Sequence, residues 1–365
     1  MKLPRSIDYG MVVPSLTLVT IGLVILFSIN LKVDSLLLDF SAWNQLLYVI
    51  VGIVTMLIIS RTEISRMARY SGWFYILSLC LVCIALLLDP VQGSRRWIDL
   101  GFFQFQPSEI MKLAEILLLA RLFNRRGKNI NKLWIFFLSI FYAALPAGLV
   151  LVQPDLGTAL VFMVIWLVMI SMTPVKKYYL VVLVLIGLSI LPFAYENLEP
   201  YQQQRVASFL DPTADPQGSG YNTLQATIAI GSGQLFGRGL SGGSQSQLNF
   251  LPEQHTDFAF AVVAEKLGFV GSLLVLVSLF ALISRSILIA WNTDDSFTMY
   301  VAVGISGLIS FHAVVNIGMN IGLLPVTGIP LPFISYGGTH IIISFIMVGI
   351  LQSISKHRQG LAFSS

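Results

Sequence analysis

Apolar segments long enough to cross a lipid bilayer recur along the whole chain. A transmembrane helix needs about 20 apolar residues, and ten such segments follow one another, at residues 9–30, 43–60, 72–88, 107–123, 133–152, 157–172, 178–195, 257–283, 299–321 and 339–355. Only 11% of the residues are charged, against about 25% in soluble domains. The sequence therefore predicts an all-α polytopic membrane protein with ten transmembrane helices, forming a single integral-membrane domain over residues 1–365.

Basic residues indicate the orientation of these helices. Cytoplasmic loops of membrane proteins keep lysine and arginine, and with a cytoplasmic N-terminus most of the 22 lysine and arginine residues fall in inner loops. We therefore expect both termini to be cytoplasmic. The net charge of +4 follows from this loop placement, and the sequence contains no nucleic-acid-binding module.

Two connections on the predicted outer side have unusual sequences. The larger one, residues 196–256, joins the seventh and eighth predicted helices, and its glycine-rich part is typical of either a flexible connector or a phosphate-binding loop. The other, residues 322–338, is apolar but broken by prolines. Irregular backbone at membrane depth must be buried in protein or line a cavity. We therefore expect residues 322–338 to wall an outward-facing cleft.

Two predicted spans begin with charged residues. Glu109, Lys112 and Glu115 follow one another at intervals of three residues, which predicts a lysine between two carboxylates on one helix. Asp257 begins the eighth span, where Ala261, Ala264 and Gly268 are expected to share its helical face. A charged group at the bilayer centre costs about 2.5–3.5 kcal/mol on insertion scales, so these residues indicate a functional site.

These charged residues also have structural interpretations. The set of Glu109, Lys112 and Glu115 is either an internal salt-bridge cluster or a contact to substrate or metal. Asp257 is a helix N-terminal residue stabilised by the helix dipole, a catalytic residue, or both.

Residues near the outer side add further candidates. Arg96 is either an interface anchor or a diphosphate ligand, because arginine matches phosphate geometry, and Trp97 beside it is typical of the membrane interface. Asp155 is expected to cap the sixth helix. His255 is either a surface or a site residue, while His312 and His340 are interpreted as buried packing or capping residues.

Five ordered stretches of the sequence resemble one known family. They are GSRRWIDLGFFQFQPSEIMKLAE at 93–115, QPDLGTA at 153–159, YNTLQATIAIGSGQLFGRG at 221–239, QSQLNFLPEQHTDFAFAVVAEKLG at 245–268 and GLLPVTGIPLPFISYGGT at 322–339. Together they resemble the SEDS (shape, elongation, division and sporulation) family, membrane proteins that polymerise peptidoglycan glycan strands. The runs WIDL and LPEQHTDFAF are more similar to its elongation members, the RodA group, than to the FtsW and SpoVE groups.

The resemblance implies that lipid II is the substrate and that Asp257 is the residue most closely tied to activity. In glycan extension a sugar hydroxyl attacks the anomeric carbon of a second sugar and displaces a lipid diphosphate. A carboxylate supplies the base that the hydroxyl needs, and Lys112 and Arg96 supply positive charge for the departing diphosphate. We therefore expect an inverting glycosyltransferase with Asp257 as general base.

Other expected contacts surround this base. A divalent cation, Mg²⁺ or Mn²⁺, is an expected cofactor, and no organic cofactor is expected. Its candidate ligands are Glu109, Glu115 and Asp257. The expected substrate-binding residues are Arg96, Trp97, Glu109, Lys112, Glu115, Asp155, His255 and Ser335.

The resemblance also implies partners and a location. The expected partner is a class B penicillin-binding protein transpeptidase, packed beside the predicted eighth and ninth helices as part of the elongation machinery. The location is the bacterial cytoplasmic (inner) membrane, with the active site facing the extracytoplasmic side. The alternative function is a flippase that moves lipid II, because intramembrane charges also line transport routes. Lys266 stands where the family has an acidic residue, and its role stays open.

Overall fold

The structure is a computed structural model that describes residues 7–30, 40–90, 94–99, 101, 103–196, 200–210, 219–248, 250–251 and 253–362. Its helices are α1 (Tyr9–Asn30), α2 (Phe40–Ile59), α3 (Ile64–Leu87), α4 (Pro107–Arg126), the 3-10 helix η1 (Gly127–Asn129), α5 (Leu133–Val152), α6 (Leu156–Ser171), α7 (Lys177–Glu196), α8 (Pro200–Leu210), α9 (Ser219–Ser232), α10 (Ser244–Gln247), α11 (Ala259–Trp291), α12 (Ser296–Asn320) and α13 (Gly338–Ala362). Two short strands, β1 (Ile98–Asp99) and β2 (Gln104–Phe105), pair antiparallel with Ile98 opposite Phe105.

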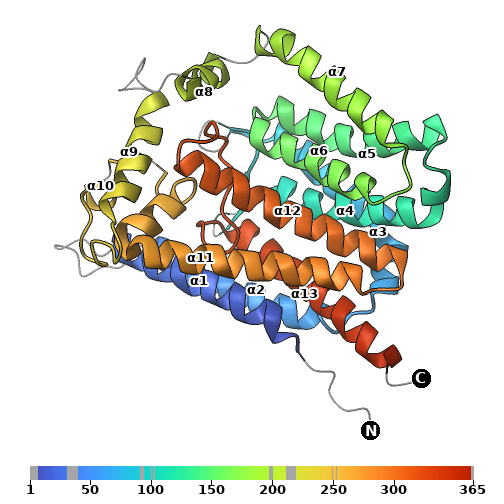
Figure 1. Cartoon of the computed structure of the whole chain (residues 1–365), viewed down its shortest axis with the longest axis horizontal. Coiled ribbons are helices and arrows are strands. Elements are labelled where there is room, and N and C mark those ends of the chain that lie inside the picture. Colours follow the sequence, from blue (N-terminus) through green and yellow to red (C-terminus); the bar gives the residue numbers. More distant parts are fainter. Residues whose placement is uncertain are drawn as a thin grey trace.

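The long helices form a bundle, and α8, α9 and α10 lie beyond it toward one end (Figure 1). Each of the ten predicted spans coincides with a helix, α1 to α7 or α11 to α13. Among the described residues, seven helices are long and apolar enough to cross a membrane. A multi-pass helical membrane protein is therefore confirmed, whereas the number ten stays a prediction that also needs α4, α6 and α7.

Helix α4 occupies the middle of the bundle. It contacts α3, α5, α6, α12 and α13, and most of its side chains are buried, Glu109, Lys112 and Glu115 among them. Charge in this helix is therefore enclosed by protein, which explains why α4 carries more charge than the helices around it.

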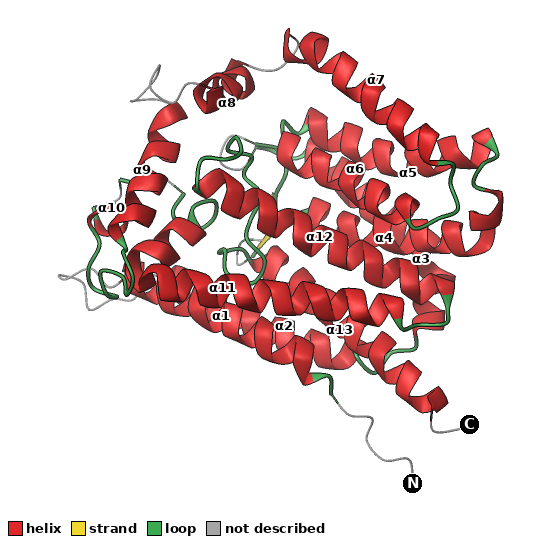
Figure 2. Ribbon diagram, in the orientation of Figure 1, coloured by secondary structure: helices red, strands yellow, loops and turns green. Residues whose placement is uncertain are grey.

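The two ends of the bundle differ in their connections. Many loops gather around α9, α10 and the start of α11 (Figure 2). At the other end of α11, the Asp8 carboxylate accepts hydrogen bonds from Arg285 (2.8 Å) and from Ser355 of α13 (3.0 Å). The start of α1 and the last turns of α13 therefore lie together. This arrangement agrees with termini on one side of the membrane, and the cytoplasmic assignment of that side stays a prediction.

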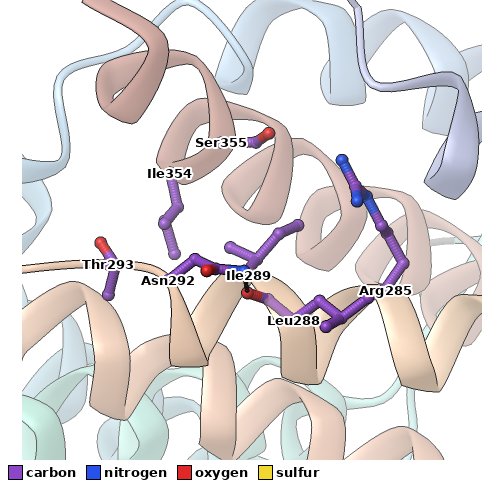
Figure 3. A pocket seen from close by; sticks show the side chains of 7 residues that line it. All are labelled: Arg285, Leu288, Ile289, Asn292, Thr293, Ile354 and Ser355. Carbon is purple, nitrogen blue, oxygen red and sulfur yellow. Dashed lines mark hydrogen bonds between the residues drawn. The ribbon is translucent and has the colours of Figure 1, made fainter. Parts of the chain in front are cut away.

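A pocket opens beside this ion pair, between the end of α11 and the last turns of α13 (Figure 3). Its lining residues are Arg285, Leu288, Ile289, Asn292, Thr293, Ile354 and Ser355. The pocket lies at the far end of α11 from Asp257, so it is separate from the charged residues that the sequence singles out.

Helix α11 begins later than the sequence predicts and is broken. Asp257 lies in the preceding turn, where its backbone N–H donates to the Glu253 carbonyl (3.1 Å), and the helix starts at Ala259. Gly268 has φ 67° and ψ −161° inside the helix, a conformation that glycine adopts without a Cβ clash. The predicted common helical face of Asp257, Ala261, Ala264 and Gly268 is therefore wrong, because the helical twist is interrupted at both ends of this stretch.

Loop backbone supplies the hydrogen bonds that the helix loses at this break. Two loop N–H groups donate to helix carbonyls and two helix N–H groups donate to loop carbonyls. The pairs are Arg238 to Glu265 (2.8 Å), Gly239 to Lys266 (3.2 Å), Phe269 to Gln234 (2.8 Å) and Val270 to Leu235 (3.1 Å). Residues 234–239 are therefore hydrogen-bonded to α11 on both sides of Gly268, which favours an ordered segment here over a flexible connector.

Side chains from α11 also hold the glycine-rich loop. The Glu265 carboxylate accepts hydrogen bonds from the backbone N–H groups of Gln245 (2.9 Å) and Ser246 (3.0 Å). Lys266 donates to the Leu240 carbonyl (2.9 Å), which gives this lysine a structural contact. Because a carboxylate of the protein already occupies these two N–H groups, the structure favours an internal anchor over a phosphate-binding loop here.

Gly268→Ala is predicted to destabilise the protein by about 1–3 kcal/mol, since a side chain at this φ is strained. The added Cβ would also lie 2.3 Å from the Gly237 backbone nitrogen. Gly148→Ala in α5 is the matched control, because a Cβ there meets nothing within 4 Å and alanine favours helix. Thermal unfolding in detergent measures both. Equal melting temperatures for the two variants would contradict the role assigned to Gly268.

Candidate active site

Two asparagines of α12 hold the turn at residues 253–258, which carries Asp257 and which we call the Asp257 turn. The side-chain amides of Asn316 (3.1 Å) and Asn320 (3.0 Å) both donate to the Asp257 backbone carbonyl. Both asparagines are fully buried. The turn is therefore fastened to a long helix, although it is itself irregular.

Residues 322–337 pack against the same turn without forming a helix, as the sequence predicts. The Ser335 hydroxyl accepts from the Leu331 N–H (2.8 Å) and donates to the Thr256 carbonyl (2.6 Å). Gly328 lies beside Asp257, where an added Cβ would be 3.6 Å from the carboxylate Oδ2. Both hydrogen bonds of the buried Ser335 are internal, so the structure shows a structural contact for this residue, and its substrate contact stays a prediction.

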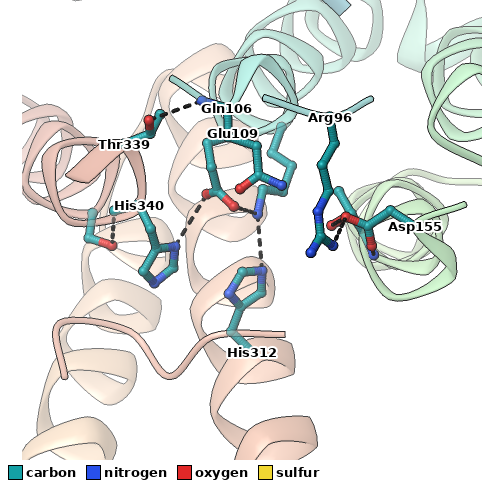
Figure 4. Close-up of polar contacts among 10 residues, drawn as sticks. Arg96, Gln106, Glu109, Asp155, His312, Thr339 and His340 are labelled. Carbon is teal, nitrogen blue, oxygen red and sulfur yellow. Dashed lines mark hydrogen bonds and ion pairs between the residues drawn. The ribbon is translucent and has the colours of Figure 1, made fainter. Parts of the chain in front are cut away.

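A second carboxylate near this segment caps a helix. The Asp155 side chain accepts from the Thr158 N–H (2.9 Å) at the start of α6, which confirms the predicted cap. Its Oδ2 also lies 3.3 Å from Nη1 of Arg96 (Figure 4). A Cβ on Gly157 would be 2.4 Å from the Thr327 carbonyl oxygen. The start of α6 and the segment 322–337 are therefore in close contact.

Burial and neighbouring charges raise the pKa of Asp257 to about 6. Loss of solvent around the carboxylate is the largest cause, and the negative charge of Glu253 adds to it. The positive charges of Arg205 and Arg96 and the Thr256 hydrogen bond act in the opposite direction. Asp257 is therefore a half-buried carboxyl that changes its charge near neutral pH, which is the property of a general base.

Arg205 lies near Asp257, and nothing in the sequence indicates this position. It lies on α8, and its guanidinium donates to the Val326 carbonyl (3.2 Å) within electrostatic range of Asp257. Its position in a long polar connection gave no sequence signal, because neither spacing nor hydropathy reports which loop residues fold back onto a site. Asn316 and Asn320 were missed because they look like ordinary polar residues inside an apolar span.

Glu109 and Lys112 of α4 form a buried cluster with His312 and His340 (Figure 4). Lys112 Nζ lies 2.7 Å from Glu109 Oε1 and 3.4 Å from His312 Nε2. His340 Nδ1 lies 3.2 Å from the other Glu109 oxygen, and the two histidine rings stack with centroids 5.6 Å apart. All four side chains are buried. The histidines are thus buried, as the sequence predicts, but they also complete a polar network that joins α4, α12 and α13.

Lys112 lies between Glu109 and Glu115 on one helix, as predicted, but Glu115 is not part of this cluster. Neither carboxylate oxygen of Glu115 has a hydrogen-bond partner among the described residues. Helical side chains lean toward the N-terminus of their helix, so Lys112 reaches back to Glu109 and away from Glu115.

Two predicted contacts remain, Trp97 and His255, and His255 lies in the same turn as Asp257. Trp97 and His255 are both half-buried, and the His255 carbonyl accepts from the Tyr336 N–H (2.8 Å). A small pocket opens here, with mostly apolar walls. Its lining residues are Gly22, Ile25, Leu26, Ile29, Gln254, His255, Ala259, Ile334 and Tyr336.

The predicted metal ligands do not assemble. Across the part of the chain that the structure describes, no group of three His, Cys, Asp or Glu side chains lies close enough to hold a metal ion. Glu109 is instead paired with Lys112 and His340. The expected divalent cation therefore stays a prediction, and no step of the reaction is assigned to it.

The fold and the site define a multi-pass membrane protein with a carboxylate-centred polar site at one end of a helical bundle. The sequence model of the family described as "Cell cycle protein" (FtsW, RodA and SpoVE) matches residues 10–360. The chain belongs to this family, as the sequence resemblance indicates.

The similar proteins come from more than one branch of the family. Stage V sporulation protein E of Bacillus subtilis is 37% identical over 96% of this chain and 98% of its own. Peptidoglycan glycosyltransferase MrdB of Escherichia coli is 40% identical over 81% of each chain. Proteins named as probable FtsW match at similar identity, 36% for that of Coxiella burnetii. The expected glycosyltransferase class agrees with these names, whereas the expected preference for the elongation branch is not resolved by them.

A solved structure has the same fold over nearly the whole chain. One chain of a structure described as "Structural coordination of polymerization and crosslinking by a peptidoglycan synthase complex" superposes with a TM-score of 0.83 at 29% identity, covering 97% of this chain and 98% of that one.

Lys112→Met is predicted to lower stability by about 3–5 kcal/mol, because it leaves the buried Glu109 carboxylate without its cation. Replacing both partners, Lys112→Met with Glu109→Gln, removes the uncompensated charge and is expected to cost less than the single change. Thermal unfolding of the two variants measures the difference. A double variant that is less stable than Lys112→Met would contradict the ion pair.

Proposed function

We propose that the chain is a peptidoglycan glycosyltransferase that extends glycan strands from lipid II. The observation that carries the proposal is the environment of Asp257, a half-buried carboxyl within electrostatic range of Arg96 and Arg205. The pocket beside His255 has apolar walls from α1, a property that suits a lipid-linked substrate. Membership of a family whose relatives are named peptidoglycan glycosyltransferases supports the same class of reaction.

In the proposed reaction Asp257 takes the proton from the attacking sugar hydroxyl. The hydroxyl oxygen forms a bond to the anomeric carbon of the donor, and the bond from that carbon to the diphosphate oxygen breaks, with its electron pair leaving on the diphosphate. One displacement of this kind inverts the anomeric carbon. Arg96 and Arg205 stabilise the departing negative charge, since arginine pairs well with phosphate oxygens.

Lys112 takes a different role from the one the sequence predicts. Its ammonium group is buried and already contacts Glu109 and His312. We therefore assign the charge at the diphosphate to the two arginines, and we assign Lys112 to holding α4 against α12.

The proposal includes a location and a partner. The chain lies in the bacterial cytoplasmic membrane with Asp257 facing the extracytoplasmic side, and it acts in cell elongation. A class B penicillin-binding protein binds beside α11 and α12, the predicted eighth and ninth helices. Exposed apolar side chains on α11, among them Phe269, Leu273 and Phe280, and the similarity to a chain of a peptidoglycan synthase complex support such a contact.

Asp257→Ala and Asp257→Asn are predicted to abolish glycan formation from purified lipid II, because neither side chain accepts the hydroxyl proton as a carboxylate does. Gel separation of labelled product measures the strands. Asp294→Asn, in the exposed connection between α11 and α12, is the control and is expected to remain active.

The glycan assay and a transfer assay in liposomes together distinguish the competing functions. Full glycan synthesis by Asp257→Ala would reject Asp257 as the base. Transfer of labelled lipid II across liposomes, with no glycan formed by the unchanged chain, would favour the flippase.

The rate of glycan synthesis is predicted to fall as the pH drops below about 6, where the Asp257 carboxyl becomes protonated. Glu253→Gln removes a negative charge that raises this pKa, so the midpoint of the acid limb moves to lower pH. Arg205→Gln removes a positive charge that lowers it, so the midpoint moves to higher pH. Initial rates across the pH range measure both, and shifts of the same sign in the two variants would contradict the assignment.

A further inference from the structure

Three polar side chains lie in a row along α12 at intervals of four residues. His312, Asn316 and Asn320, which we call the α12 polar row, are each exposed by 2% or less. Residues four apart lie on one face of a helix, and this face meets Lys112 of α4 at His312 and irregular backbone at Asn316 and Asn320. Burying three polar side chains is costly unless each has a hydrogen-bond partner, so the partners of this row indicate its role.

The α12 polar row connects the buried cluster of α4 to the Asp257 turn. His312 contacts Lys112 Nζ (3.4 Å) and hydrogen-bonds the backbone of Pro330. Asn316 donates to the carbonyls of Ile329 (2.8 Å) and Asp257 (3.1 Å). The row thus holds the segment 322–337 and the Asp257 turn against the same helix.

Asn320 acts on both sides of the turn. Its Nδ2 donates to the Asp257 carbonyl (3.0 Å), and its Oδ1 accepts from the Ala261 N–H (3.0 Å). The first N–H groups of a helix have no partner within the helix, and the residue before α11, Phe258, makes no side-chain cap. Asn320 therefore caps α11 from a neighbouring helix while it fixes the residue that carries the carboxylate.

We propose that Asn316 and Asn320 are positioning residues that fix the Asp257 carboxylate relative to its sugar hydroxyl. The proposal rests on the proposed function, because it assigns these amides to the same reaction. A displacement of about 1 Å at a reacting group can cost about 100-fold in rate, and the backbone carbonyl of Asp257 itself accepts from both amides. The two amides act through backbone contacts and do not touch the substrate.

Two variants of Asn320 separate its contacts. Asn320→Leu removes all of them at similar size. Asn320→Asp keeps an oxygen that accepts from the Ala261 N–H but has no N–H group to donate to the Asp257 carbonyl. Ser306→Ala is the control on the same helix, because the buried Ser306 hydroxyl donates within α12 to the Ala302 carbonyl (2.7 Å).

Both Asn320 variants are expected to lower kcat for glycan synthesis by about 100-fold, with KM for lipid II unchanged and the control fully active. Asn320→Asp adds a negative charge near Asp257, which raises the pKa of Asp257, so the acid limb is measured in Asn320→Leu. In that variant it is expected to move to lower pH, because a released turn exposes the carboxylate to water and weakens the burial that raises its pKa. Lower kcat with an unchanged acid limb would reduce Asn320 to a structural role and overturn the proposal, and so would an unchanged kcat.

Amide hydrogen exchange tests the same contacts without any activity. Asn320→Asp is expected to speed exchange in residues 253–258 while α12 keeps the protection of the unchanged chain. Equal exchange in these residues for Asn320→Asp and Ser306→Ala would overturn the proposal. If the unchanged chain makes no glycan, the proposed function fails, and the exchange result still decides whether the α12 polar row holds the turn.

Discussion

Backbone polar groups that lie among apolar helices need hydrogen-bond partners inside the protein. This requirement determines how the irregular segments of the site are held. The segment 322–337 is irregular, yet its carbonyl at Ile329 accepts from Asn316 and its N–H at Leu331 donates to Ser335. The Asp257 turn is satisfied by the same helix, α12. The two irregular segments therefore meet because they share polar partners, and the carboxylate sits where they meet.

Charge in the bundle is divided between two places with different access to solvent. Glu109 and Lys112 neutralise each other inside the bundle, with both side chains almost fully buried. Arg96 is partly exposed and pairs with Asp155 at the start of α6, within electrostatic range of Asp257. A buried ion pair suits helix assembly, whereas a partly exposed arginine remains available to an anionic ligand. Because Arg96 is open to solvent and Lys112 is not, Arg96 is available to bind the diphosphate, whereas Lys112 stabilises the packing of α4.

Sequence reasoning succeeded where the information is local. Long apolar runs predicted the helices, Asp155 before an apolar run predicted a cap, and the prolines of residues 322–338 predicted irregular backbone. It failed where partners are distant in sequence. The start of α11 at Ala259 depends on Asn320, about 60 residues further along the chain, and the break at Gly268 depends on residues 234–239. Helical spacing also did not reveal that Lys112 pairs with only one of its two carboxylate neighbours.

The central claim is that the carboxylate of Asp257 removes a proton from a sugar hydroxyl. The most direct measurement is chemical rescue of the Asp257→Ala chain by formate, a small carboxylate that can enter the space left by the side chain. The account predicts that glycan synthesis from lipid II returns in proportion to the formate concentration, while the unchanged chain does not respond. Glycan synthesis by the variant at the rate of the unchanged chain, with no formate present, would contradict the account.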